Sequence, residues 1–272
     1  MRLYERLKGI ASTIIPQRVR RTACSACGHV ARVQSKRVLW PELIAEWQLS
    51  PEWVRWFDDR EGSQCEACGS SLRSRHLAKV ISETVAVEHG VTEPSLARLV
   101  ANPQFQRLTV CEINSAGDLH QFLQTLPHLY YSEYGSADPA VPSENLLALS
   151  YPDNTFDLVV TSETLEHVPD VDKALSEIRR VLKVGGHHVF TVPLVSARQN
   201  TKQRARIVDG VVVHDHPPSY HGSRETRGGD LLVFYEFGSD FLERCKAAGF
   251  ATVLHTDPDN PANVAITAER IK

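Results

Sequence analysis

Residues 156–193, FDLVVTSETLEHVPDVDKALSEIRRVLKVGGHHVFTVP, constrain the fold more than any other segment. The two ends, FDLVVTS and HHVFTVP, are short, apolar and β-branched, as strands buried on both faces should be. Between them, apolar residues recur every three or four positions over 170–183, which predicts a helix that Asp170 caps and Gly185 ends. Strand, helix and strand in this order predict a right-handed parallel crossover, and therefore an open α/β sheet.

The rest of the chain divides into two parts of different composition. The first ninety residues are dense in Cys, Arg and Trp, and alternating apolar runs and amphipathic segments begin near residue 104. Residues 77–100 look helical on both sides of Gly90 and would connect the parts. We therefore expect a small domain over 1–90 and an α/β domain over 100–272. Strands are expected near 107–113, 129–133, 145–148, 156–162, 186–192, 250–255 and 262–268, and further helices near 117–126 and 238–248.

The bulk composition is that of a soluble globular protein. Hydrophobic residues make up 42% of the 272 residues and charged residues 23%, and the formal net charge is −3. This balance gives no global reason to expect nucleic-acid binding, and no apolar run is long enough to predict a transmembrane helix. The basic N-terminal stretch MRLYERLKGIASTIIPQRVRR lacks the features of a secretory signal. It is expected to pack on the body as a helix, with contact to an anionic membrane as the alternative, and we expect a cytoplasmic chain with reduced thiols.

Two Cys-x-x-Cys-Gly motifs, CSACG at 24–28 and CEACG at 65–69, are the most specific local signal. Two residues between thiolates let both sulfurs reach one ion, so two such turns supply a closed tetrahedral site. The predicted ligands of a structural zinc ion are Cys24, Cys27, Cys65 and Cys68, with iron, an iron–sulfur cluster or a redox role as alternatives. Two short helices, PELIAEWQ and SPEWVRWF, account for the long spacing between the motifs, with Pro41 and Pro51 at first helical positions. The four tryptophans between residues 40 and 56 are expected to fill the core of this small domain, although they could also stack on bases.

The run from Leu149 to Pro193 resembles the central and later motifs of class I S-adenosylmethionine-dependent methyltransferases. In that family a strand is followed by a Glu-His pair, a helix and an RVLKPGG turn. Here the turn is RVLKVGG, with Val184 in place of proline. The whole chain is similar to a bacterial subgroup with N-terminal Cys-x-x-Cys knuckles and no characterised acceptor. The resemblance implies a Rossmann-like sheet of seven strands, with the cofactor across the carboxyl ends of the first strands.

The resemblance also assigns cofactor residues. The segment EINSAG at 112–117 takes the place of the glycine-rich first motif, and Asn114 there tolerates left-handed backbone angles. Because S-adenosylmethionine has no phosphates, its loop needs fewer glycines than a dinucleotide loop does. Glu133 would accept hydrogen bonds from the ribose hydroxyls, and Asn145 one from the adenine amino group. The predicted cofactor-binding residues are Glu112, Asn114, Ser115, Ala116, Gly117, Glu133, Asn145, Leu146 and Ser162.

Candidate groups for the chemistry follow the strand near 156–162. Methyl transfer mainly needs alignment of the acceptor and exclusion of water, with a general base for a hydroxyl acceptor. His167 and Glu163 are weak candidates for this base, and Glu166 lies beside them. An irregular insertion over about 194–232 is expected to form a substrate lid. A metal site formed by His214, His216 and His221 is possible but disfavoured. Tyr220 and His221 are instead candidate acceptor contacts. Four arginines would suit an anionic acceptor: Arg204, Arg206, Arg224 and Arg227.

Three functional hypotheses follow. The leading one is a zinc-stabilised methyltransferase that methylates oxygen of a small-molecule or glycan-type acceptor. The second keeps the activity but makes RNA or protein the acceptor, with the tryptophan-rich zinc module as the recognition surface. The third is a binding protein whose altered first motif no longer holds a cofactor. The neutral composition disfavours the second hypothesis, and the retained Glu112 and Glu133 disfavour the third.

Overall fold

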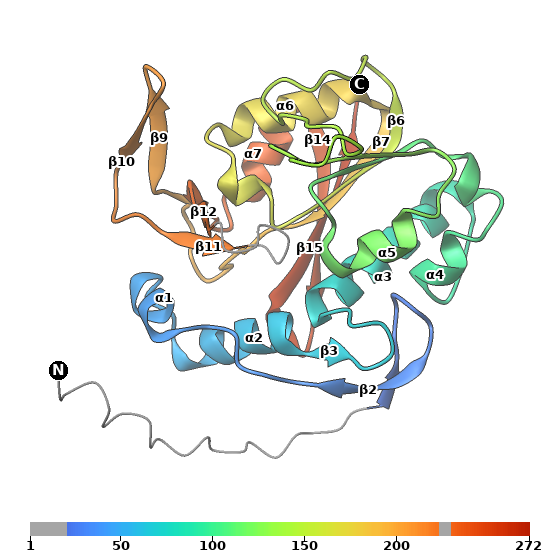
Figure 1. Cartoon of the computed structure of the whole chain (residues 1–272), viewed down its shortest axis with the longest axis horizontal. Coiled ribbons are helices and arrows are strands. Elements are labelled where there is room, and N and C mark those ends of the chain that lie inside the picture. The colour runs from blue at the N-terminus through green and yellow to red at the C-terminus, as the bar shows by residue number, and fades with distance from the viewer. Residues whose placement is uncertain (1–20, 223–229) are drawn as a thin grey trace.

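The structure is a computed structural model and describes residues 21–222 and 230–272. A six-stranded mixed sheet forms the centre of this part (Figure 1). The order is β14–β15–β7–β6–β4–β5. The four strands β5, β4, β6 and β7 are parallel, whereas β15 is antiparallel to both β7 and β14. The strand bounds are β4 Val110–Ile113, β5 Leu129–Ser132, β6 Phe156–Ser162, β7 Leu182–Thr191, β14 Phe250–Asp257 and β15 Asn260–Arg270. The α/β, Rossmann-like fold class is confirmed.

The predicted crossover is present between β6 and β7. Helix α6 spans Val171–Val181, and Asp170 caps it by accepting a hydrogen bond from the backbone N–H of Lys173. Its apolar face lies in one buried cluster with α7 (Phe241–Ala247), on one side of the sheet. On the other side, α3 (Leu72–His89) buries Leu77 and Ile81 in a cluster with side chains of β6 and β7. Each such buried aliphatic side chain contributes about 1.5–3 kcal/mol to folding.

The strand predicted over 145–148 is wrong. These residues form a tight turn, closed by a bridge between Asn145 and Ala148, so β5 is the edge of the sheet and six strands are described in place of seven. The Asn145 side chain accepts a hydrogen bond from the N–H of Leu147, and the buried Glu144 carboxylate accepts one from the N–H of Ser150. Side-chain acceptors thus replace the backbone partners that a strand would need. The helix predicted over 117–126 is also shorter, because a 3-10 turn η2 (Gly117–Leu119) leads into α5 (His120–Leu123).

The N-terminal part lies against the end of the sheet at which the parallel strands finish (Figure 1). Strands β1 (Arg21–Ala23), β2 (Val30–Gln34) and β3 (Gln64–Cys65) form a small antiparallel sheet. The two expected helices, α1 (Pro41–Glu46) and α2 (Pro51–Gly62), begin at proline. The connector contains α3, which Gly90 ends with φ +66°, and then α4 (Leu96–Leu99) and η1 (Phe105–Arg107). The basic segment 1–20 lies outside the described residues.

One of the four tryptophans is buried and two are half-buried. Trp47 is buried, and Trp53 and Trp56 meet edge to face beside Phe57, in a cluster that also includes Val195. Trp40 alone among the four is exposed, at 42%. Trp47 is thus a core residue, whereas Trp53 and Trp56 are half-buried in a cluster that the N-terminal part shares with the α/β part.

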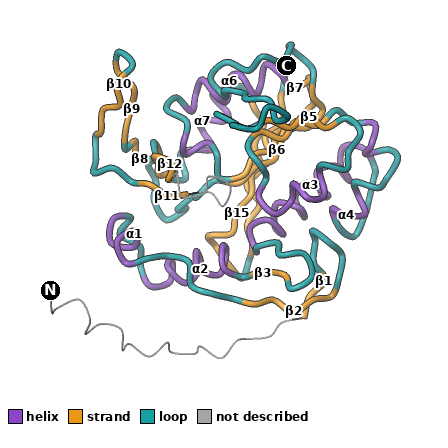
Figure 2. Tube along the Cα trace, in the orientation of Figure 1, coloured by secondary structure: helices purple, strands orange, loops and turns teal. Residues whose placement is uncertain are grey.

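The insertion is not irregular, as the sequence had indicated, but built of short strands: β8 (Lys202–Gln203), β9 (Ala205–Val208), β10 (Val211–His214), β11 (Tyr220–Gly222), β12 (Asp230–Leu232) and β13 (Tyr235–Glu236). Strands β9 and β10 form a hairpin that projects from the body (Figure 2). Its turn, Asp209-Gly210, has positive φ at both positions, as a two-residue hairpin turn requires. In the described part of the chain, no helix is long and apolar enough to span a membrane.

Candidate functional site

The loop after β4 is organised by a buried carboxylate. Glu112 is fully buried; one of its oxygens accepts a hydrogen bond from the N–H of Ala116 and the other lies 2.7 Å from Nδ1 of His120. Both oxygens therefore have partners within the protein. Glu112 can act on a bound ligand only through the shape of the loop that it holds.

The backbone of this loop takes the conformations that a close ligand approach requires. Asn114 has φ +52° and Gly117 has φ +60°. The Asn114 side chain also accepts a hydrogen bond from the N–H of Tyr134, which ties the loop after β4 to the loop after β5. Ala116 is buried and Ser115 is partly exposed. The asparagine thus performs a backbone role that glycine usually fills.

Replacing Asn114 tests this role. We expect Asn114→Gly to cost about 1 kcal/mol, the value of one hydrogen bond, whereas Asn114→Val should cost about 1–2 kcal/mol more because a β-branched residue is strained at positive φ. Urea denaturation of both variants gives the two free energies of unfolding. Equal losses in the two variants would show that the left-handed backbone angle is not important for stability.

Glu133 lies beside the same loop. It follows β5, and its carboxylate accepts a hydrogen bond from the Tyr131 hydroxyl. The Tyr131 ring lies 4.1 Å, centroid to centroid, from the ring of His120, which is bonded to Glu112. The structure thus brings Glu112 and Glu133 together at the carboxyl ends of β4 and β5, through the contact between the His120 and Tyr131 rings. Asn145 is exposed and Leu146 buried in the turn that replaces the predicted third strand.

Two arginines of the N-terminal part reach the carboxyl ends of β6 and β7. Arg60 of α2 is 1% exposed and makes two hydrogen bonds to the Glu163 carboxylate, at 2.7 and 3.0 Å. Arg73 of α3 donates to Oγ of Ser162, which also bonds Thr191. Glu163 itself has φ +49°, an uncommon conformation for a residue with a side chain. Sequence reasoning missed both arginines, because nothing local marks them as partners of residues about a hundred positions away.

This pairing changes the choice of general base. Burial alone would raise the pKa of Glu163, but the charges of Arg60 and Arg73 outweigh it and lower the pKa to about 2. A carboxylate of such low basicity is a poor proton acceptor. His167, in the 3-10 turn η3 (Leu165–His167), has a pKa lowered mainly by burial and is therefore neutral near pH 7. Of the two predicted bases, Glu163 is therefore unsuited to this role.

The four cysteines of the knuckles form one cluster. Their sulfur atoms all lie within 4.8 Å of one another, and Sγ of Cys24 is 3.8 Å from Sγ of Cys68. Two thiolates at 2.3 Å from a tetrahedral zinc ion are about 3.8 Å apart. In each knuckle the glycine N–H donates to the carbonyl oxygen of the first cysteine, and Gly28 and Gly69 have φ near +80°. The donor set and its spacing fit a four-thiolate metal site.

The histidines of the insertion do not form a metal trio, which the sequence had disfavoured, and the insertion arginines that the structure describes are paired. His214 and His216 are exposed, and only His221 belongs to a cluster of potential metal ligands in the described part of the chain. Arg204 is 1% exposed and is held by ion pairs to Glu236 and Glu46, so it is not available to an anionic acceptor. Arg206 pairs with Asp215 at the surface. Arg224 and Arg227 lie outside the described residues.

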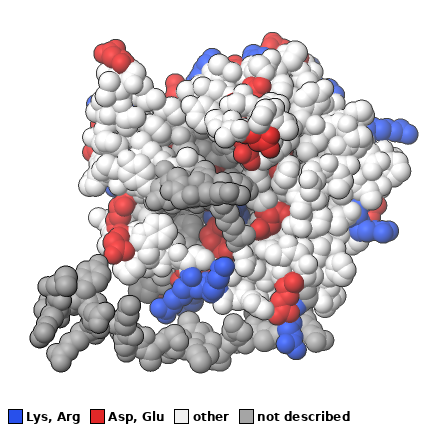
Figure 3. All heavy atoms as spheres, in the orientation of Figure 1, with Lys and Arg blue, Asp and Glu red and all other residues white. Residues whose placement is uncertain are grey.

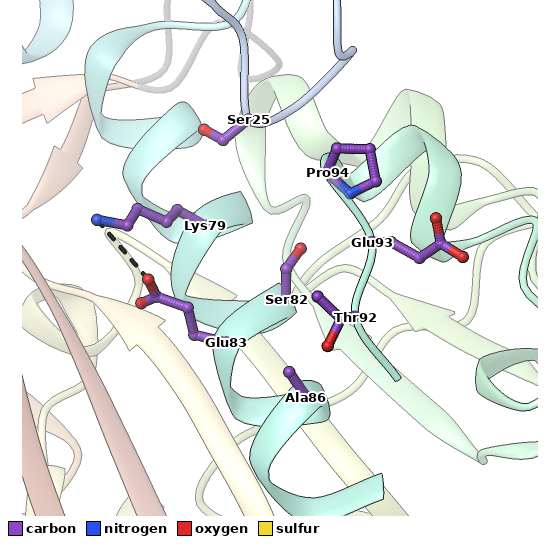
Figure 4. Close-up of a pocket in the computed structure, with 8 residues that line it drawn as sticks. All are labelled: Ser25, Lys79, Ser82, Glu83, Ala86, Thr92, Glu93 and Pro94. Atoms are coloured by element: carbon purple, nitrogen blue, oxygen red, sulfur yellow. Dashed lines mark ion pairs between the residues drawn. The ribbon is translucent and has the colours of Figure 1, made fainter. Parts of the chain in front are cut away.

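One pocket of the described residues, of about 190 Å³, lies away from the loops that follow β4 and β5 (Figure 4). Lys79, Ser82 and Glu83 of α3 form one wall and residues 92–94 the other. Lys79 and Glu83 form an ion pair at 3.7 Å across one helical turn. None of the predicted cofactor residues lines this pocket.

Part of the chain matches a known family. Residues 131–190 match the family described as "Methyltransferase domain". This range runs from β5 through β6 and α6 to the end of β7, so it includes Glu133, Ser162 and His167 but not the loop after β4. The strongest sequence resemblance therefore lies in the parallel half of the sheet.

Curated relatives and a solved structure are similar over parts of the chain. The ubiquinone/menaquinone biosynthesis C-methyltransferase UbiE of Hydrogenovibrio crunogenus is 64% identical over 42 residues, which is 15% of this chain and 16% of that protein. The sterol 24-C-methyltransferase of Pneumocystis carinii is 25% identical over 194 residues, covering 70% of this chain and 49% of that protein. The sugar N-methyltransferase KedS8 from a Streptoalloteichus species has 16% identity and a TM-score of 0.43, with 65% of this chain and 85% of that chain covered. The chain thus spans less than half the length of either curated relative.

Proposed function

We propose that the protein is an S-adenosylmethionine-dependent methyltransferase. The observation that carries this proposal is the arrangement of the loops after β4 and β5. There Glu133 lies beside a loop in which Asn114 and Gly117 have left-handed backbone angles. These loops lie at the carboxyl end of the parallel strands, where ligands bind in open α/β folds. The methyltransferase-domain match over residues 131–190 supports the same activity.

In this proposal the residues at this end of the sheet hold the cofactor as the resemblance to class I enzymes implies. The Glu133 carboxylate accepts hydrogen bonds from the ribose hydroxyls, and the loop that Glu112 shapes holds the methionine end. Asn145 and Leu146 contact the adenine, and Ser162 lies at the end of β6. The bound cofactor supplies an electrophilic methyl group, so the protein has to align the acceptor and exclude water.

We propose a small-molecule or glycan-type acceptor, methylated at oxygen. His167 lies just beyond β6, at the end of the sheet where an acceptor would meet the cofactor. Two of the similar proteins are by name carbon methyltransferases and one a sugar nitrogen methyltransferase. Carbon is therefore the second candidate atom, and the mass and fragmentation of a methylated product distinguish the two.

The four-cysteine cluster is proposed to bind a structural zinc ion. Because all four ligands come from the protein, the ion has no open position for a substrate. An RNA acceptor is a weaker candidate. Figure 3 shows Lys and Arg side chains scattered among Asp and Glu on the face in view, without the basic patch that a phosphate backbone favours.

Titration calorimetry with S-adenosylhomocysteine tests the proposal. Native protein should bind with a measurable heat, and Glu133→Ala should weaken binding about 10- to 100-fold, since hydrogen bonds to a charged acceptor contribute about 1.5–3 kcal/mol. The matched control is Glu243→Ala, which removes an exposed carboxylate on α7 and should bind like the native protein. Absence of heat with both S-adenosylhomocysteine and S-adenosylmethionine would favour the non-catalytic hypothesis.

A further inference from the structure

Glu166, His167 and His221 form a second cluster of potential metal ligands. Their ligand atoms lie within 4.8 Å of one another. Glu166 and His167 belong to η3, directly after β6, whereas His221 comes from β11 in the insertion. Nε2 of each histidine is 3.7 Å from the same oxygen, Oε1 of Glu166. Two imidazoles from distant parts of the chain thus converge on one carboxylate.

The Glu166 carboxylate is buried without a hydrogen bond. Its exposed fraction is 0%, and among the described residues neither of its oxygens has a hydrogen-bond partner. An ionised carboxylate in such a position costs several kcal/mol unless a cation or donor compensates it. The nearby Arg60 is already bonded to Glu163 and Glu61. Among residues 21–222 and 230–272, the carboxylate therefore has no direct cationic partner other than the two imidazoles.

The hydrogen bond of His167 leaves its other ring nitrogen for a metal ion. Nδ1 of His167 is 3.0 Å from the carbonyl oxygen of Leu232, and a carbonyl can only accept a hydrogen bond. Nδ1 therefore carries a proton, and Nε2 is the ring nitrogen that faces Glu166. Nε2 is thus the atom of His167 that can bind an ion beside the carboxylate. A backbone carbonyl that fixes the tautomer in this way is the usual outer partner of a metal-binding histidine.

We propose that Glu166, His167 and His221 bind a divalent transition-metal ion of the zinc class. Ligands at about 2.1 Å from a tetrahedral zinc ion are about 3.4 Å apart, so the observed 3.7 Å requires only a small contraction on binding. Two histidines and one carboxylate leave a fourth position open for water or for an oxygen of a ligand. The site is therefore of a different kind from the closed four-cysteine cluster.

This site would also fix the insertion against the sheet. His221 packs against the ring of His167, with centroids 4.6 Å apart, and lies 6.2 Å from the ring of Trp47. An ion held by Glu166 and His167 on η3 and by His221 on β11 links the two segments through bonds stronger than these ring contacts. The inference does not rest on methyl transfer, because it follows from the ligand geometry alone.

The test is the zinc content of the full chain after dialysis against a weak chelator. Native protein should hold one more zinc ion per chain than His221→Gln or Glu166→Gln. His214→Gln, which changes an exposed histidine of the same insertion, should keep the native zinc content. Circular dichroism verifies that each variant is folded, and the near-isosteric Glu166→Gln serves if His221→Gln is not.

Cobalt substitution separates this site from the cysteine cluster. Cobalt bound by thiolates gives intense sulfur-to-metal charge-transfer absorption, whereas cobalt bound by histidine and carboxylate gives only weak visible bands. A Cys65→Ser/Cys68→Ser protein that folds should keep the weak bands, and adding Glu166→Gln should remove them. Equal zinc content in native protein, His221→Gln and Glu166→Gln would overturn the proposal.

Discussion

A protein that carries both Cys65→Ser and Cys68→Ser is expected to lose the zinc ion proposed for the cysteine cluster and to unfold at a temperature about 10 °C below that of the native protein. Binding of structural zinc contributes about 10–16 kcal/mol in small zinc domains, and we expect at least about 4 kcal/mol to be lost here. In a chain of this size each kcal/mol corresponds to about 2–4 °C. Differential scanning calorimetry with metal analysis of the same sample measures both effects.

The loss should extend to the proposed cofactor loop, since the second knuckle is bonded to it. The N–H of Ser71 donates to the Asp118 carboxylate, and the Gln121 side chain donates to the carbonyl oxygen of Cys68. Affinity for S-adenosylhomocysteine should therefore fall together with zinc content. Cys245→Ala, which changes a buried cysteine outside the cluster, should keep the zinc ion. An unchanged melting temperature after demonstrated zinc loss would mean that the metal does not stabilise the fold.

The features that were predictable from sequence are those set by local spacing. The two knuckles need only a few residues each, and the β6–α6–β7 crossover follows from apolar periodicity over one continuous segment. The strand predicted at 145–148 was wrong because a short apolar run does not reveal that neighbouring Glu144 and Asn145 satisfy its backbone. The β9–β10 hairpin had a readable signal, Asp209-Gly210 between β-branched residues, which the expectation of an irregular lid overlooked.

Contacts between distant segments were the least predictable part. His221 joins Glu166 and His167 from more than fifty positions away, whereas the sequence had suggested it as an acceptor contact, with a metal trio of nearby histidines as a disfavoured alternative. Arg204 looked like a surface cation for an acceptor, but a buried Glu236 holds it. In each case the role of a polar side chain was predicted from the residues next to it in sequence. Its actual partner depends on how the insertion folds back on the sheet.

Arg60→Ala is expected to destabilise the protein by about 3–5 kcal/mol, because it removes the buried, hydrogen-bonded cation of the half-buried Glu163 carboxylate and leaves only the charge of Arg73 near it. Arg60 is 1% exposed and Glu163 19%, and their two hydrogen bonds fix α2 to the end of β6. Arg55→Ala, which removes an exposed arginine from the same helix, should cost less than about 0.5 kcal/mol. Urea denaturation of the three proteins gives these differences. Equal small losses in both variants would show that the pair does not stabilise the docking of α2.

The pH dependence of the same variants identifies Glu163 as the origin of the effect. Because the pKa of Glu163 in the folded protein is lowered from 4.5 to about 2, its ionised form is favoured by folding. The stability that it contributes is fully present above pH 4.5 and is lost as the pH falls toward 2. The difference in free energy of unfolding between native protein and Arg60→Ala should therefore be largest near neutral pH and should shrink below pH 4.5. A difference that stays constant over this range would assign the loss to packing of the Arg60 side chain, since packing does not depend on the charge of Glu163.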